Sequence, residues 1–165
     1  MSPNKFSSLV LVGALLPTMS SCAPYQEPFW VVQFCIQNDR DFVATFPSKI
    51  ASVAREYSLT IVDHSAQTER LFNYDKPSTN ENRPVGQTIN IGLFRGVRVK
   101  AMIGNLGLSR HEVLISFFGD STDKTDGDLS VAVVGALKQR WPVETVPVGT
   151  GAFPLESCKS GTKAD

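Results

Sequence analysis

The first part of the chain with a regular apolar pattern is residues 29–36, "FWVVQFCI". Every second residue from Trp30 to Ile36 is large and apolar, and Gln33 stands among the residues between them. A period of two is the pattern of a strand that turns one face toward a core. We therefore expect a strand at 29–36, with Trp30, Val32, Phe34 and Ile36 on one face and the residues between them on the other.

The next apolar residues recur at steps of three or four, which is the spacing of one helical face. They are Phe42, Phe46, Ile50, Val53 and Tyr57. Asn38 or Asp39 would cap the start of this segment. Pro47 interrupts the pattern, and proline is favoured at the first position of a helix. We therefore expect a short turn up to Phe46 and the helix itself from Pro47.

Residues 59–65, "LTIVDHS", predict a second strand, which the pattern would allow to continue through 66–72. The polar segment 73–87 predicts an exposed loop. Residues 88–94 and 97–103 then lie on either side of Arg95-Gly96. Two apolar segments around such a short polar turn predict an antiparallel hairpin.

The most apolar strand is expected at 113–118, and the acidic loop 119–128 follows it. Asp128 would cap a helix at 129–140, and 143–148 would form an edge strand, where proline is tolerated. The resulting order of strands and helices predicts an α+β fold, with a mainly antiparallel sheet and two helices packed on one face. The specific topology that we expect is ferredoxin-like with an inserted hairpin.

The N-terminus has the layout of a secretory signal, with Lys5 before the apolar run 6–16 and small residues after it. The run is too short to cross a hydrocarbon layer, which requires about 20 residues. The alternative, a buried helix of the folded domain, is disfavoured because the run lacks the polar face of a surface helix.

The residues Met19-Ser20-Ser21-Cys22 resemble the lipobox of bacterial lipoproteins, in which an aliphatic and two small residues precede the lipidated cysteine. The resemblance covers the signal segment alone. It implies lipidation of Cys22, and Ala23 in the next position implies an outer-membrane anchor facing the periplasm. The alternative is cleavage after Ala23 at the small residues 21–23, which would discard Cys22 and release a soluble secreted product.

These readings divide the chain into a signal peptide at 1–21, a lipid-anchored tether at 22–28, an α+β domain at 29–148 and a C-terminal tail at 149–165. The precursor contains three cysteines, and lipidation or removal of Cys22 leaves two. An oxidising periplasm would allow Cys35 and Cys158 to form a disulfide. In the alternative, Cys35 is a small buried residue and Cys158 a free thiol.

The net charge of the chain bears on whether its partner could be a nucleic acid. Removing residues 1–22 takes away Lys5 and leaves 15 basic against 16 acidic side chains, a formal net charge of −1. A near-neutral chain without a basic stripe lacks the electrostatic footprint of a nucleic-acid-binding protein. We expect no nucleic-acid partner.

The acidic loop offers carboxylates of the kind that calcium binds, at Asp120, Asp123 and Asp126. An EF-hand loop starting at Asp123 would place Val134 where the bidentate glutamate belongs, so the pattern fails. A solvated turn that caps the following helix through Asp126 or Asp128 explains these residues sufficiently. We expect no metal and no cofactor.

The triplet Asp63-His64-Ser65 contains the residue types of a catalytic triad, but successive strand side chains point to opposite faces. His111 has no specific motif around it, and two histidines cannot form a three-histidine zinc site. No nucleophile elbow, phosphate loop or dinucleotide motif occurs. An envelope hydrolase that uses His64 or His111 remains the alternative function.

Alternation along 97–103 points Val97, Val99, Ala101 and Ile103 inward and leaves Arg98 and Lys100 outside. With Arg95 these form a basic row that could meet an acidic partner, although basic residues on strands also prevent unwanted strand pairing. The partner-binding candidates are Arg95, Arg98, Lys100, Asp120, Asp123 and Asp126.

The function that we expect is a non-catalytic envelope lipoprotein that binds another protein, such as an immunity protein against a periplasmic antibacterial toxin. The loops at 73–87 and 119–128 would be the surfaces to test. A second alternative is a structural component of an envelope assembly, with the free edges of the hairpin as docking surface through strand addition.

Overall fold

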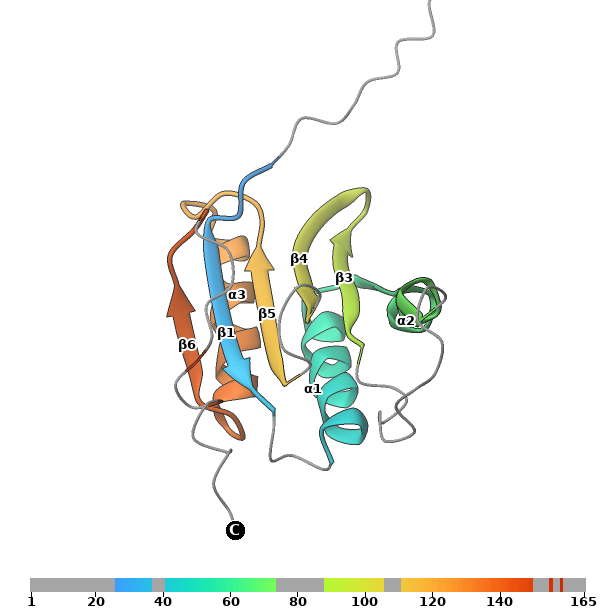
Figure 1. Cartoon of the computed structure of the whole chain (residues 1–165). Coiled ribbons are helices and arrows are strands. Elements are labelled where there is room, and N and C mark those ends of the chain that lie inside the picture. Colours follow the sequence, from blue (N-terminus) through green and yellow to red (C-terminus); the bar gives the residue numbers. More distant parts are fainter. Residues whose placement is uncertain are drawn as a thin grey trace, which may run out of the picture.

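The computed structural model describes residues 26–36, 41–73, 88–105 and 111–149, together with Leu155 and Cys158 (Figure 1). The signal peptide, the lipobox with Cys22 and most of the loop 73–87 lie outside the described residues. Asn38 and Asp39, the expected caps of the first helix, also lie outside them.

The described residues form one antiparallel sheet of six strands in the order β2-β3-β4-β5-β1-β6, with three helices. The strands are β1 (Trp30–Cys35), β2 (Thr60–Asp63), β3 (Asn90–Arg95), β4 (Arg98–Gly104), β5 (Glu112–Phe117) and β6 (Val143–Val146). The helices are α1 (Phe42–Glu56), α2 (Ser65–Asn73) and α3 (Lys124–Lys138). The expected α+β fold is therefore confirmed.

The strand order is that of a ferredoxin-like sheet into which the β3–β4 hairpin has been inserted, between β2 and β5. Both hairpin strands are consequently paired on both sides, β3 with β2 and β4 with β5. The expectation that the hairpin offers free edges is wrong, because the sheet ends at β2 and β6.

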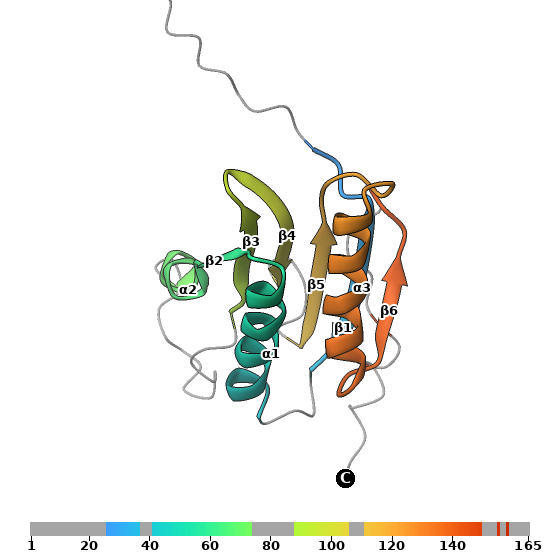
Figure 2. The ribbon, with the colours of Figure 1, turned by 180° about the vertical axis from the view of Figure 1, so that it is seen from behind.

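Helices α1 and α3 cover one face of the sheet, and α2 lies beside its β2–β3 edge (Figure 2). The core lies between that face and the two helices. From β1 it takes Val32 and Phe34, and Ile36 follows directly after the strand, while Trp30 packs against this core. These four residues share one face of the strand, as the alternating pattern predicted.

Helix α1 starts at Phe42, five residues before the expected start at Pro47, and therefore contains this proline. Phe42 and Phe46 stack with their ring centroids 4.8 Å apart, and both rings lie against Phe34 and Trp141. Aromatic burial of this kind offsets the hydrogen bond that an internal proline removes from a helix. Tertiary packing therefore carries the helix through Pro47.

The expected continuation of the second strand through 66–72 is wrong, because this segment belongs to α2. The carboxylate of Asp63 accepts a hydrogen bond from the backbone N–H of Ser65 at 2.8 Å. The N–H of Thr68 donates to the carbonyl of His64 at 2.9 Å. These bonds satisfy groups that a helix start leaves open, so the chain turns into a helix immediately after β2.

Helix α3 begins at Lys124, before the expected position, and Asp123 rather than Asp126 or Asp128 is its N-cap. The Asp123 side chain accepts a hydrogen bond from the N–H of Thr125 at 2.8 Å. Gly127 lies inside the first turns of this helix. Glycine and aspartate are poor helix formers, which is why the segment resembled a loop in the sequence.

Candidate functional site

The face of the sheet opposite α1 and α3 carries the other side chains of β1. Val31 and Gln33 are on this face, and both are buried. In the register of the sheet, Val31 lies between Ser116 of β5 and Val146 of β6. Burial on both faces means that segments other than the two helices shield this side of the sheet. We call it the open face.

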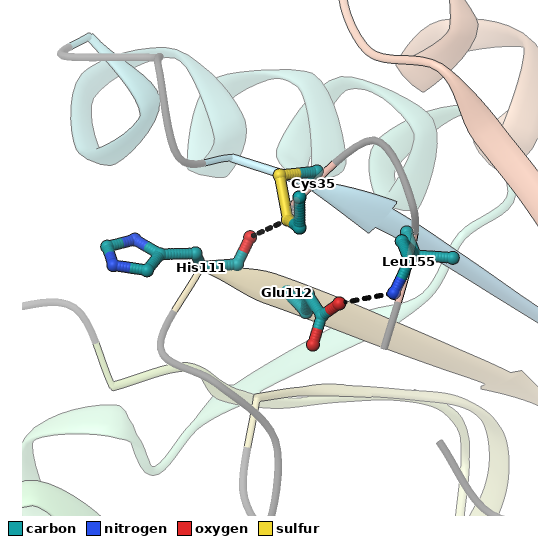
Figure 3. Close-up of a disulfide and its surroundings, with 5 residues drawn as sticks. Cys35, His111, Glu112 and Leu155 are labelled. Carbon is teal, nitrogen blue, oxygen red and sulfur yellow. Dashed lines mark hydrogen bonds between the residues drawn. A yellow bond between two sulfur atoms is a disulfide. The ribbon is translucent and has the colours of Figure 1, made fainter. Parts of the chain in front are cut away.

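Two described residues of the C-terminal tail, Leu155 and Cys158, are bonded to the open face near the end of β1 (Figure 3). Cys35 and Cys158 are joined by a disulfide, with their Cα atoms 5.5 Å apart. The N–H of Leu155 donates to Glu112 Oε1 at 2.6 Å, and Glu112 is the register partner of Cys35. The two cysteines that remain after Cys22 is set aside are therefore paired, so neither is a free thiol.

A groove of about 450 Å³ lies at the other end of the open face. Its floor comes from β1 and β5, and its walls come from the residues before β1 and after β6. The lining residues are Glu27, Pro28, Val31, Leu114, Ser116, Pro147, Val148 and Gly149. Val31 and Cys35 are four residues apart along β1, a distance of about 13 Å, whereas Leu114 on the floor is two residues from Glu112, the register partner of Cys35.

The lining of the groove is partly apolar and partly polar. Its volume lies within the range of about 300–1,000 Å³ that is typical of ligand pockets. Among the lining residues, the side chains with polar groups are Glu27 and Ser116. A carboxylate and a hydroxyl without a histidine or lysine between them do not make an activated nucleophile. The groove therefore suits a mainly apolar ligand group that carries one hydrogen-bond donor.

The expected basic row is divided between the interior and the surface. In the pairing of β3 with β4, Leu93 lies opposite Ala101 and the next residue, Phe94, lies opposite Val99. Lys100 therefore has no partner in β3 and forms a bulge in β4. Such a bulge redirects side chains, and Lys100 is buried with its ammonium 2.8 Å from Asp126 Oδ2. The outward position expected for Lys100 is wrong.

Asp126 lies in the first turn of α3 and is 3% exposed. Its Oδ2 also accepts from the N–H of Asp120 at 3.3 Å. Its Oδ1 has no hydrogen bond, and the Arg95 guanidinium lies 3.7 Å away, at charge-contact rather than hydrogen-bond distance. The structure therefore brings Arg95, Lys100 and Asp126 together, as a link between the hairpin and α3.

The other three candidates of the expected binding surface are exposed. Arg98 lies at the start of β4, beside the turn in which Val97, expected to face inward, is 98% exposed. Asp120 accepts from the hydroxyl and the N–H of Thr122, and Asp123 caps α3. The side-chain and backbone hydrogen bonds from Thr122 lower the pKa of Asp120, and the backbone hydrogen bond from Thr125 lowers that of Asp123.

The two histidines are not brought together. His64 follows β2 and His111 precedes β5, so strands β3 and β4 lie between them, and both side chains are exposed. Ser65 Oγ accepts from the N–H of Asn90 at 2.9 Å, which leaves it a structural role. Figure 3 shows the imidazole of His111 pointing away from the disulfide.

Among the described residues, no three His, Cys, Asp or Glu side chains gather as metal ligands would. In the same part of the chain, no helix has the length and apolar character needed to cross a membrane.

Sequence reasoning missed the groove because its lining comes from three distant parts of the chain, at 27–31, 114–116 and 147–149. The prolines that flank β1 and β6 are the signal that could have pointed to its walls. Comparison with known proteins adds no relative, since no family model, no curated protein and no solved structure matches this chain.

Proposed function

We propose that the protein is a non-catalytic lipoprotein of the bacterial envelope, anchored through Cys22, that binds a partner protein in the groove of the open face. The groove between the tether and the residues after β6 is the observation that carries this proposal. A partner that inserts an apolar side chain would contact Val31 and Leu114 on the floor and Val148 at the rim.

The disulfide between Cys35 and Cys158 supports a periplasmic location. Disulfides persist in oxidising environments such as the periplasm and are rare in the cytosol. Cys35 and Cys158 are 123 residues apart in sequence, so their bond closes nearly the whole described domain. A domain of this size gains stability from such a link. Export would bring the chain into the oxidising compartment in which the link forms.

The arrangement of the described charged groups supports a binding role over hydrolysis. The alternative enzyme would need His64 or His111 beside a nucleophile or a bound water activated by a carboxylate. Asp63 and Ser65 are instead bonded to backbone groups at the start of α2 and β3.

The anchor is tested by the intact mass of the protein from the envelope fraction. We expect a mass that begins at Cys22 and includes acyl chains, with a gain of two protons after thiol reduction. A lipid-free mass that begins at Pro24 would contradict the anchor and favour the secreted alternative.

The groove is tested by affinity capture from envelope extracts with the native chain, Val148→Glu and Val131→Glu. Val148 is 42% exposed at the groove, and Val131 is 64% exposed on α3, so the second variant is a matched control. We expect one partner to be retained by the native chain and the control but lost by Val148→Glu. Equal capture by all three would contradict the site.

The identity of the captured protein distinguishes the versions of the proposal. An antibacterial toxin would establish an immunity protein, and stoichiometric envelope subunits would establish a structural component. His64→Ala and His111→Ala should both retain the partner, because neither residue lines the groove.

A further inference from the structure

The turn between β3 and β4 presents an apolar side chain at the tip of a hairpin. Gly96 has a φ of +61°, which glycine adopts readily and which a two-residue turn requires. Val97 follows it and is 98% exposed, the largest exposure of any large apolar side chain among the described residues. Arg95 and Arg98 face each other in the register on either side. We call residues 95–98 the hairpin tip.

The hairpin tip lies at the end of the sheet from which the N-terminal tether departs (Figures 1 and 2). The N–H of Phe29, just before β1, donates to the carbonyl of Phe117 at 2.9 Å. The N–H of Phe118 donates to the carbonyl of Lys100, also at 2.9 Å. These bonds place the start of β1, the end of β5 and the start of β4 at one level.

The length of the tether limits how far this end can be from the membrane. Phe29 is seven residues after Cys22 in the sequence, and an extended chain spans at most about 3.6 Å per residue. A lipid on Cys22 therefore holds the start of β1 within about 25 Å of the bilayer surface. This distance is little more than the length of β1 itself, about 20 Å.

The charges at this end are not uniform. Arg98 is exposed, and the side chain of Arg95 is 35% exposed beside the buried Asp126. Asp120 and Asp123 lie beyond the end of β5, and their hydrogen bonds from Thr122 and Thr125 keep them ionised. An anionic surface would repel the segment after β5 and attract the hairpin tip. Glu27 on the tether adds one more negative charge near the groove.

We propose that the hairpin tip rests on the headgroup layer of the membrane that holds the tether, with Val97 in the interface and Arg98 bound to lipid phosphates. The proposal rests on the lipid anchor of the proposed function. Guanidinium groups bind phosphate through two parallel hydrogen bonds, and apolar side chains beside basic ones favour the interface. Because the tether makes this contact intramolecular, a weak interaction is sufficient. The contact would fix which face of the domain the partner meets.

The test places a tryptophan at the tip of the lipidated chain. Val97→Trp and the control Val131→Trp are purified from membranes and reconstituted in vesicles that contain phosphatidylglycerol and lipids with brominated acyl chains. Bromine quenches tryptophan on contact, and Trp30 and Trp141 contribute the same background to both variants. We expect at least twofold stronger quenching of the added tryptophan at 97 than at 131.

Charge reversal tests the phosphate contact. Arg98→Glu in the Val97→Trp chain should reduce the quenching to the level of the control. Vesicles with the same brominated chains, but with phosphatidylcholine in place of phosphatidylglycerol, should have the same effect. Lys138→Glu, at the last residue of α3, should leave the quenching unchanged. Equal quenching at 97 and 131, or quenching that survives Arg98→Glu, would overturn the proposal.

Failure of the anchor is recognised separately. A chain that does not float with the vesicles and whose mass lacks acyl chains would overturn both the anchor and the membrane contact. A chain that floats but shows no quenching at position 97 would overturn the membrane contact alone.

Discussion

The ammonium group of Lys100 lies 2.8 Å from Oδ2 of Asp126, and the two side chains are 10% and 3% exposed. This ion pair joins β4 of the inserted hairpin to the first turn of α3. A negative side chain near the start of a helix is also favoured by the helix dipole. The pair therefore holds the hairpin and the helix in one relative position.

Asp126→Asn should destabilise the domain by about 3–5 kcal/mol, because it leaves the charge of Lys100 buried without its partner. The measurement is urea-induced unfolding, followed by fluorescence of the native tryptophans. Asp128→Asn is the control, since Asp128 is an exposed residue of the same helix, and it should cost less than about 1 kcal/mol. Equal losses in the two variants would contradict the structural role of the pair.

The pair can also be replaced as a unit. Lys100→Met combined with Asp126→Leu should recover part of the stability that Asp126→Asn loses, because apolar residues of similar size often substitute for a buried ion pair. A double variant less stable than Asp126→Asn would show that the hydrogen bond from the N–H of Asp120 to Asp126 matters more than the ion pair.

The exposed carboxylates of Asp120 and Asp123 should make the free energy of unfolding depend on pH in the acidic range. The hydrogen bonds of Asp120 and Asp123 lower their pKa in the folded protein below the ordinary value of 3.8. A lowered folded pKa contributes stability that is present above the ordinary pKa and is lost as the pH falls through the folded value. Asp123→Asn should therefore be less stable than the native chain near roughly pH 6, and this difference should shrink as the pH falls below the ordinary pKa of 3.8.

The control for this pH effect is Asp123→Ala. Asparagine still caps a helix, whereas alanine does not, so Asp123→Ala should be the less stable variant at every pH. A difference between the native chain and Asp123→Asn that does not change with pH would contradict the assignment to the Asp123 carboxylate.

Two glycines near the ion pair should respond to alanine in opposite directions. Gly119 has a φ of +137°, and a side-chain carbon there would collide with the carboxylate of Asp126, so Gly119→Ala should destabilise the domain by more than about 1 kcal/mol. Gly127 lies within α3 with open space around it, and Gly127→Ala should stabilise by about 0.5–1 kcal/mol. Thermal unfolding measures both, and a stabilised Gly119→Ala would contradict the described approach of Asp126.

The disulfide should account for a large part of the stability. Cys158→Ser should lower the free energy of unfolding by about 2–5 kcal/mol, because it releases a link across 123 residues. Adding a reductant to the native chain should have a similar effect. The combined variant Cys35→Ser with Cys158→Ser should not respond to reductant, and a response would show that another group is being reduced.

Much of the fold could be predicted from local patterns. The two-residue period at 29–36 correctly predicted a strand and the residues that share one of its faces, and the apolar segments around Arg95-Gly96 correctly predicted the hairpin. Both patterns follow from side chains that alternate between the two faces of a strand, which depends only on neighbouring residues. Cysteine parity likewise suggested the pairing of Cys35 with Cys158.

The sequence by itself determined the α+β class, the strand order along the chain and the near-neutral charge, because each depends on composition or short-range periodicity. Only the tertiary structure decided that α1 passes through Pro47, that α3 begins at Lys124 and that Lys100 turns inward to Asp126. These outcomes depend on partners far along the chain: the ring of Trp141 for α1, and the bulge opposite Leu93 for Lys100. The groove has the same origin, since three separated segments form it only after the sheet has assembled.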